Sequence, residues 1–135
     1  MKYLLDTNIV VLALTDDPKL PNRAREIIDS PEDEKIVSIA SIWEIMIKYI
    51  KNPADMVLSG EVVVACLEEY GIPLLSINLA HIFTLGSLHT TNDHRDPFDR
   101  LLLAQSKHEG ITLVTCDGEL DGYNEPTLLS LQKGK

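Results

Sequence analysis

Short apolar runs alternate with longer stretches of helical periodicity along nearly the whole chain of 135 residues. A short apolar run that ends at polar residues is typical of a buried strand. Such runs predict strands at residues 2–6, 36–39, 73–77 and 111–115, with a weaker one at 127–131. The stretches between them predict helices at residues 9–14, 21–30, 42–51, 60–70, 79–85 and 97–109.

The alternation of strands and helices predicts the fold class. In the stretch at 97–109, Phe98, Leu101 and Leu102 fall on one face of a helix, and Gly110 follows as a natural helix end. Strands that alternate with helices form a mostly parallel sheet covered on both faces. We therefore expect a single α/β domain over residues 1–135, with about four to five strands.

Composition narrows the class of protein. The apolar content of 44% suits a compact core, and the longest apolar runs, at 9–14 and 62–67, are far shorter than the roughly 20 residues of a membrane helix. Met1 leads directly into the first predicted strand and leaves no room for a signal peptide. We expect a soluble, cytoplasmic protein without a membrane partner, in which Cys66 and Cys116 are reduced and bind no zinc.

The net charge of −9 bears on any role with nucleic acid. The chain has 21 acidic and 12 basic residues, whereas proteins that bind phosphate backbones usually carry a basic surface. Net charge therefore argues against a high-affinity nucleic-acid clamp. Binding would need a local basic rim, a metal ion, or the charges of a partner.

Four acids fall where a parallel sheet places its site. Ligands bind beyond the carboxyl ends of the strands in open α/β sheets. Asp6 ends the first predicted strand, and Asp117 follows the strand at 111–115. Glu44 and Asp99 lie in the predicted first turns of the helices at 42–51 and 97–109.

Each acid also has a purely structural explanation. Ser41 and Glu44 have the spacing of a capping box, and Asp96 before Pro97 is a good helix start with Asp99 facing the helix dipole. Asp117 before a glycine is typical of a turn. The two explanations are compatible, because a capping carboxylate keeps lone pairs free for a metal.

The four acids taken together favour a metal site. Carboxylates gathered at one end of a sheet repel each other by a few kcal/mol per pair at contact distance. A divalent cation offsets that repulsion, and hard oxygen ligands suit Mg²⁺ or Mn²⁺. Such a site can activate water and stabilise charge on a phosphoryl group, which indicates metal-dependent phosphodiesterase chemistry.

Four motifs in this order resemble a known family: LLDTN, SIWEIMIK, HRDPFDRLLLAQ and LVTCD. Together they are similar to PIN domains, and more closely to the VapC-like toxins of type II toxin–antitoxin pairs, from Met1 to about Leu131. The resemblance implies a three-layer fold and an endoribonuclease that uses Mg²⁺ or Mn²⁺ on an RNA substrate. It also implies a cognate antitoxin that silences the enzyme through its active-site groove.

The resemblance also assigns roles to individual residues. The polar residue two places after the first acid matches Asn8, and the Thr of the Thr-x-Asp motif matches Thr115; both would orient the acids. Asp96 is expected to be a cap or a residue behind the metal ligands, and Asp121 is either an extra acid or part of a surface turn. The metal-site acids of the family match Asp6, Glu44, Asp99 and Asp117.

Several basic residues are candidates for RNA contact. Arg95 and Arg100 flank the acids of the HRDPFDR motif and are positioned to hold phosphates. Lys48 and Lys51 would extend a basic rim along the same helix as Glu44. For Lys48 an ordinary i,i+4 pair with Glu44 is the alternative.

Three further residues near the acids receive a structural expectation. His94 makes an HxD pattern with Asp96, but we expect a solvated loop histidine rather than a ligand or base, because the acids already explain the chemistry. Trp43 could stack on a base, although packing is the usual role of an aromatic at a helix start. Cys116 is expected to point away from Asp117 and fill the core.

Other functions stay open at this point. A haloacid-dehalogenase-type phosphatase also begins with an Asp after its first strand, but its second Asp is replaced here by Asn8. A non-catalytic PIN binding module would be expected to lack some of the four acids. We also expect a homodimer, and the apolar faces at 42–50 and 60–70 are candidate partner surfaces, although core packing explains them equally well.

Overall fold

The computed structural model describes residues 1–55 and 58–134 of the chain. Its centre is a five-stranded sheet in the order β3-β2-β1-β4-β5, in which every neighbouring pair is parallel. The strands are β1 (Lys2–Leu5), β2 (Glu34–Ser38), β3 (Leu74–Leu75), β4 (Thr112–Thr115) and β5 (Leu128–Ser130). The predicted α/β class is therefore confirmed, including the weak last strand.

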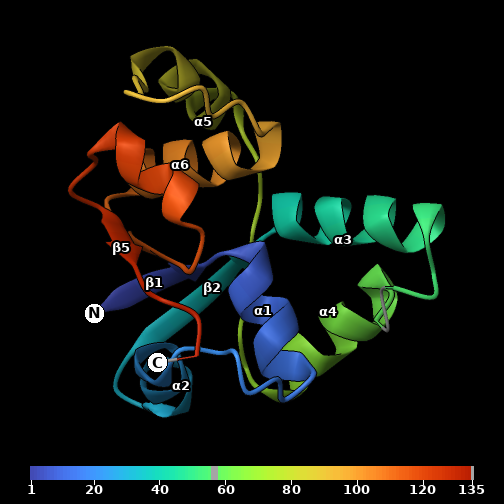
Figure 1. Ribbon diagram of the computed structural model, residues 1–135. Helices are drawn as coiled ribbons and strands as arrows, with labels where there is room; N and C mark the ends of the chain where they lie inside the picture. Colours follow the sequence, from blue (N-terminus) through green and yellow to red (C-terminus); the bar gives the residue numbers. More distant parts are fainter. Residues whose placement is uncertain (56–57, 135) are drawn as a thin grey trace.

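Helices cover both faces of the sheet and make a three-layer fold. Figure 1 shows α5 and α6 on one side, and α1, α2 and α4 on the other. The α-helices are α1 (Thr7–Leu14), α2 (Asn22–Asp29), α3 (Ile39–Lys51), α4 (Gly60–Glu69), α5 (Leu79–Thr84) and α6 (Pro97–Glu109). Two 3₁₀ turns, η1 (Leu85–Ser87) and η2 (Gly118–Tyr123), follow α5 and β4.

Strand β1 lies at the centre of the sheet because both of its faces are apolar. Leu5 packs into the core cluster beneath α1, α2 and α4, whereas Leu4 packs into the cluster beneath α6. A strand buried on both sides is a continuous apolar run, which explains why YLL rather than an alternating pattern begins the chain. Asp6 follows directly, so the central strand delivers a carboxylate to the carboxyl edge of the sheet.

The structure corrects the predicted start of α3. The helix begins at Ile39 rather than residue 42, because the Ser38 hydroxyl caps it by accepting the Ala40 N–H at 3.0 Å. The proposed capping box of Ser41 and Glu44 is therefore wrong. Ser41 is buried inside the first turn and its hydroxyl accepts a hydrogen bond from the Thr7 hydroxyl at 2.9 Å, which ties α3 to the start of α1. Glu44 consequently lies in the second turn.

The predicted place of Cys116 in the core is confirmed. Cys66 and Cys116 are both free thiols, and Cys116 packs in the core on the α1 side of the sheet. Among the described residues, no helix has both the length and the apolar character needed to cross a membrane.

Candidate metal centre

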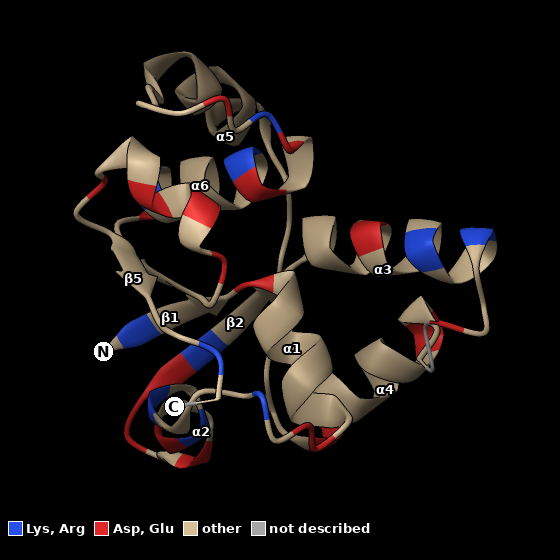
Figure 2. Cartoon of the chain, in the orientation of Figure 1, with Lys and Arg blue, Asp and Glu red and all other residues tan. Residues whose placement is uncertain are grey.

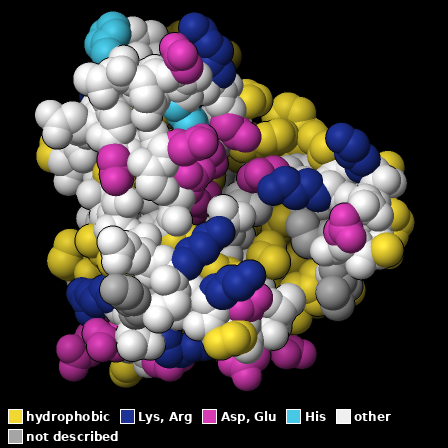
Figure 3. Space-filling model, in the orientation of Figure 1, with side chains coloured by type: hydrophobic (Ala, Val, Ile, Leu, Met, Phe, Trp, Pro, Cys, Tyr) yellow, Lys and Arg dark blue, Asp and Glu magenta, His cyan; other side chains and the backbone are white. Residues whose placement is uncertain are grey.

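The four predicted acids meet in one pocket at the carboxyl edge of the sheet. Adjacent strands β1 and β4 lead into Asp6 and Asp117, while α6 and α3 present Asp99 and Glu44 from either side. In Figure 3 acidic side chains gather along a hollow in this face, with basic side chains at its margin. The pocket has a volume of about 130 Å³ and is lined by Asp6, Thr7, Asn8, Glu44, Lys48, Asp96, Asp99 and Asp117.

Asp6 is fixed by hydrogen bonds to both of its carboxylate oxygens. Oδ1 accepts the Thr7 N–H at 2.7 Å and so caps α1, and Oδ2 accepts the Thr115 hydroxyl at 2.6 Å. The side chain is almost fully buried. Burial raises the pKa of Asp6 to about 6, with smaller contributions from the charges of Glu44 and Asp117, although the two hydrogen bonds oppose the shift.

Thr115 connects two of the acids. Its hydroxyl donates to Asp6 and accepts the Asp117 N–H at 3.0 Å, so one buried side chain holds both the Asp6 carboxylate and the backbone at Asp117. Asp117 in turn begins η2, because its Oδ1 accepts the Glu119 N–H at 3.0 Å. The turn expected after Asp117 is therefore the capped start of a 3₁₀ helix.

Glu44 has one satisfied and one unsatisfied oxygen. Oε2 lies 2.9 Å from the Lys48 ammonium, which is the i,i+4 pair considered from the sequence. Oε1 is buried and has no hydrogen-bond partner among the described residues. A buried carboxylate oxygen without a partner is costly, so this oxygen is a candidate ligand atom for a cation.

Asp99 is the most strongly perturbed acid. It lies in the first turn of α6, where Asp96 caps the helix by accepting the Phe98 and Asp99 N–H groups at 2.9 and 3.0 Å. Burial raises the pKa of Asp99 to about 8, reinforced by the charges of Asp6, Asp96 and Asp117. The cluster therefore resists full ionisation at neutral pH unless positive charge enters it.

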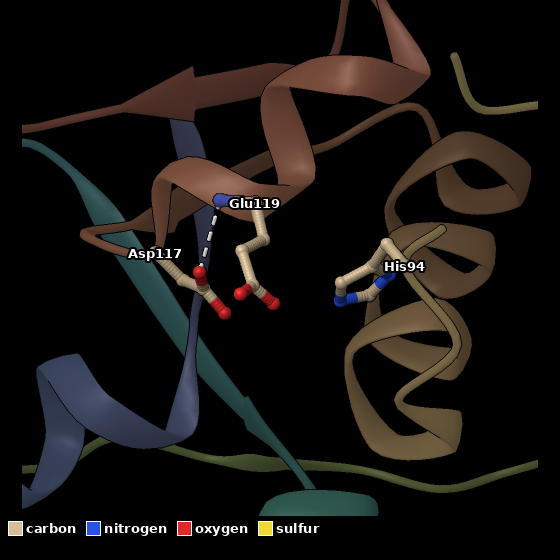
Figure 4. A group of neighbouring side chains, drawn as sticks. All are labelled: His94, Asp117 and Glu119. Atoms are coloured by element: carbon tan, nitrogen blue, oxygen red, sulfur yellow. Dashed lines mark hydrogen bonds between the residues drawn. The ribbon is translucent and has the colours of Figure 1, made fainter. Parts of the chain in front are cut away.

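The structure adds Glu119 to the acids, which the sequence reasoning did not single out. Figure 4 shows the Glu119 carboxylate between that of Asp117 and the His94 ring, and one ligand atom from each of the three residues lies within 4.8 Å of the others. The spacing D-x-E at the start of a 3₁₀ turn was the available signal. Glu119 lies, with Asp96, in a second pocket beside the first.

His94 is not the solvated loop histidine that the sequence suggested. Its side chain is only 1% exposed, and both ring nitrogens have partners. Nδ1 lies 2.8 Å from the Tyr123 hydroxyl, and Nε2 lies 3.2 Å from Oδ2 of Asp99. The expectation failed because the partner Tyr123 is 29 residues away in the chain.

The basic candidates occupy different positions around the acids. Figure 2 shows the acid of α3 followed along the helix by two basic residues, Lys48 and Lys51, of which Lys48 lines the pocket. Arg95 is exposed and lines the pocket next to it. Arg100 turns away, because its guanidinium donates to the Tyr123 hydroxyl at 3.1 Å and to the Leu85 carbonyl at 3.5 Å.

Two remaining predicted residues lie at the margin of the site. Trp43 is 55% exposed, and its ring meets that of Phe98 edge-on at 4.9 Å, so it packs across α3 and α6 while keeping an open face. Asp121 is exposed and is not among the residues that line the acidic pocket, so its position is that of a surface turn.

The all-parallel sheet and its acidic pocket define an α/β protein with a candidate divalent-cation site at the carboxyl edge. The family model described as the PIN domain matches residues 3–125, and the chain belongs to this family. The resemblance inferred from the four motifs is thereby confirmed at the level of the family. A comparison with curated proteins found no match.

Solved structures confirm the fold. The chain is similar to one in VapBC2 from Rickettsia felis bound to a promoter DNA fragment, with a TM-score of 0.71, 18% identity, and coverage of 98% of this chain and 99% of that one. A chain in a toxin–antitoxin complex from Klebsiella pneumoniae has a TM-score of 0.65 and 15% identity, with coverage of 95% of this chain and 96% of that one. A chain in VapBC-1 from nontypeable Haemophilus influenzae has a TM-score of 0.65 and 17% identity, with coverage of 96% of this chain and 98% of that one. At these identities the likeness establishes the shared architecture.

Proposed function

We propose that this protein is a metal-dependent endoribonuclease that acts as the toxin of a type II toxin–antitoxin pair. The observation that carries the proposal is the pocket of four carboxylates in which Oε1 of Glu44 is buried and has no hydrogen-bond partner among the residues that the structure describes. Membership of the PIN family and the likeness to VapBC structures support the same function. The proposed substrate is RNA, and the proposed partner is a cognate antitoxin.

The residues of the pocket fit a divalent cation. They offer carboxylate oxygens, which are the ligands that Mg²⁺ and Mn²⁺ prefer. The pKa values of Asp6 and Asp99 are raised first by burial and then by neighbouring acids, so a cation would stabilise their charged forms. Oε1 of Glu44, which has no hydrogen-bond partner among the described residues, offers a further ligand atom. We assign the cation to Asp6 and Asp99 directly, with Glu44 and Asp117 acting directly or through water.

Each side chain has a distinct role in the proposed reaction. A bound Mg²⁺ or Mn²⁺ would supply a water molecule of lowered pKa for attack on an RNA phosphodiester. Thr115 and the Thr7 amide hold the Asp6 carboxylate in one orientation, and Thr115 also fixes the backbone at Asp117. Asn8 lines the same pocket, where its amide can orient a ligand or the substrate.

The proposed RNA path follows the basic residues beside the pocket. Lys48 lines the acidic pocket and Arg95 the neighbouring one, so both can contact phosphates on either side of the scissile bond. Lys51 extends the α3 side. We assign no phosphate contact to Arg100, whose guanidinium is engaged by Tyr123 and Leu85.

The proposed biological setting is the cytoplasm, where the toxin would be a homodimer silenced by its antitoxin. The Klebsiella pneumoniae neighbour is a toxin–antitoxin complex, which supports a protein partner for this chain as well. Because the site is acidic, a basic segment of the antitoxin entering the groove would neutralise the carboxylates as the cation does.

Cleavage of labelled total RNA by the purified protein tests the proposal. The protein is assayed with Mn²⁺, with Mg²⁺ and with EDTA, beside Asp6→Asn and Asp99→Asn, with Asp121→Asn as the matched surface control. We expect cleavage with metal in the wild type and in Asp121→Asn, and none with EDTA or in the two pocket variants. Metal-dependent cleavage that survives in both pocket variants would refute the assignment.

An inactive but metal-binding wild type would instead favour a non-catalytic PIN binding module. Expression without the antitoxin then separates the two cases, because a toxin arrests growth and a binding module does not. Trapping of a phosphoaspartate at Asp6 would support a phosphatase in place of a nuclease.

A further inference from the structure

We propose that Arg100, Tyr123 and His94 form a directed chain of hydrogen bonds that positions the Asp99 carboxylate as a metal ligand. The inference rests on the proposed function, since Asp99 is one of its ligands. It assigns a role to three residues outside the acidic quartet. His94, Tyr123 and Arg100 are positioning residues in this scheme, because they act on the site through Asp99.

The contacts run without a gap from Arg100 to Asp99. The Arg100 guanidinium lies 3.1 Å from the Tyr123 hydroxyl, which lies 2.8 Å from Nδ1 of His94. Nε2 of the same ring lies 3.2 Å from Oδ2 of Asp99. The hydrogen-bond chain therefore joins a permanent cation to a carboxylate of the pocket through the side chains of Tyr123 and His94.

The chemistry of the groups gives the chain its direction. A guanidinium can only donate, so the Tyr123 oxygen accepts from Arg100. The single phenolic proton of Tyr123 then has two candidate acceptors, Nδ1 of His94 at 2.8 Å and the His94 carbonyl at 3.3 Å, and the shorter contact favours the ring. With Nδ1 accepting, the ring proton lies on Nε2 and is donated to Asp99.

Packing holds these side chains in place. His94 and Tyr123 are both buried, and their rings meet edge-on with centroids 5.3 Å apart. The Arg100 guanidinium also lies 5.7 Å from the centre of the Tyr123 ring, a cation–π distance. Side chains fixed in this way can direct a hydrogen bond without the entropy cost that an exposed donor would carry.

The loop before α6 is also bound to η2. The His94 N–H donates to the Asn92 side chain at 3.0 Å, and the Asn92 amide donates to the Glu119 carbonyl at 3.0 Å. The Thr91 N–H donates to the Gly122 carbonyl at 3.0 Å. These bonds connect the loop before α6, which leads to Asp99, with η2, which begins at Asp117. Together with the hydrogen-bond chain they set the position of one acid relative to the other.

Such positioning matters because the acids repel one another. A carboxylate surrounded by like charges rotates away unless a donor holds it, and groups behind a metal ligand commonly change metal affinity by about 10- to 100-fold. His94 supplies that donor, because its Nε2 lies 3.2 Å from Oδ2 of Asp99. The Asp99 carboxylate is then already in the orientation that a cation requires, so binding does not have to fix its side chain first.

Binding of Mn²⁺ to the free protein, followed by the electron paramagnetic resonance signal of unbound Mn²⁺, tests the chain without any RNA. His94→Leu removes both ring nitrogens and is expected to weaken binding by about 10- to 100-fold. His94→Gln keeps a donor at the position of Nε2 and is expected to restore binding to within about threefold of the wild type. A role limited to folding would not produce this rescue.

Tyr123→Phe keeps the packed ring and removes only the hydroxyl. We expect a loss in affinity of about threefold or more, and no loss in the matched control Tyr70→Phe, since Tyr70 is 67% exposed. The double variant of His94→Leu with Tyr123→Phe should bind as His94→Leu alone, because Tyr123 acts through His94.

The outcomes distinguish a failure of the hydrogen-bond chain from a failure of the proposed function. A wild type that binds Mn²⁺, with His94→Leu and Tyr123→Phe binding equally well, overturns the chain and leaves the metal site intact. Additive losses in the double variant also overturn it, because Tyr123 would then act by another route. A wild type that binds no Mn²⁺ overturns the proposed function together with the chain.

Discussion

Exchange of Asp99 for Asn should stabilise the metal-free protein while abolishing its metal binding. In the folded state the pKa of Asp99 is raised from 3.8 to about 8, first by burial and then by neighbouring acids. The unfolded chain therefore releases this proton near pH 4, whereas the folded chain keeps it until about pH 8. Folding takes up a proton between these limits, so the contribution of Asp99 to stability falls as the pH rises through that window.

The size of the expected gain in stability follows from the pKa shift of Asp99, reduced for screening by solvent. Each tenfold change in proton affinity is worth about 1.4 kcal/mol, so full ionisation against this pKa would cost up to about 6 kcal/mol. The Asp99 side chain is still 13% exposed, and water in the pocket screens its neighbours, so we expect about 2 kcal/mol. For a domain of this size that corresponds to a rise in Tm of roughly 5 to 10 °C.

Urea denaturation in EDTA at about pH 5 and about pH 8.5 measures the effect. Asp99→Asn should exceed the wild type by about 2 kcal/mol at the higher pH and by much less at the lower one. Asp121→Asn is the surface control and should stay within about 0.5 kcal/mol of the wild type at both. Saturating Mn²⁺ should reverse the order at high pH, because only the wild type gains binding energy. An Asp99→Asn protein no more stable than the wild type at high pH would show that the carboxylates do not strain the fold.

Three other substitutions probe the surroundings of the site. Glu44→Gln should weaken Mn²⁺ binding by more than about tenfold and change the free energy of unfolding by less than about 1 kcal/mol, as measured by titration and urea denaturation. Gly122→Ala places a Cβ 2.7 Å from side-chain atoms of the loop at 90–92 and should weaken Mn²⁺ binding, whereas Gly86→Ala, which meets no atom within 4 Å, should not. His81→Leu removes a fully buried, hydrogen-bonded ring that is not among the residues lining the pocket, so it should cost about 2 kcal/mol of stability and leave Mn²⁺ affinity unchanged. If Gly86→Ala weakened Mn²⁺ binding as much as Gly122→Ala, or if His81→Leu weakened it at all, the proposed positioning of Asp99 by the loop and η2 would be contradicted.

The sequence predicted the elements better than their ends. Apolar runs located all five strands, but β3 extends over only Leu74–Leu75, because the parallel pairing with β2 covers only that pair. The start of α3 was misplaced because both Ser38 and Ser41 can cap a helix, and only the tertiary contact of Ser41 with Thr7 selects between them. The order of the strands was not predictable, since apolar runs carry no information on which neighbours pair.

The site was predictable where chemistry follows local position, and not where it depends on contacts between distant segments. Asp6, Asp99 and Asp117 follow strands or begin helices, so the rules for parallel sheets place them together. His94 and Arg100 were misread because both depend on Tyr123, a residue in a 3₁₀ turn with no signature of its own. A histidine beside an acid in a loop pattern looks solvated until its distant partner is known.

Capping and metal binding are not competing explanations for these acids. Asp6 caps α1 and Asp117 caps η2, yet both line the pocket. A cap uses one oxygen of a carboxylate and fixes its orientation, which is what a rigid metal ligand requires. Glu44 is the informative exception, because Ser38 caps its helix instead and, within residues 1–55 and 58–134, its second oxygen is buried without a hydrogen-bond partner. A purely structural role accounts for the caps but leaves that oxygen unexplained, whereas the proposed cation would give it a partner and is compatible with the caps.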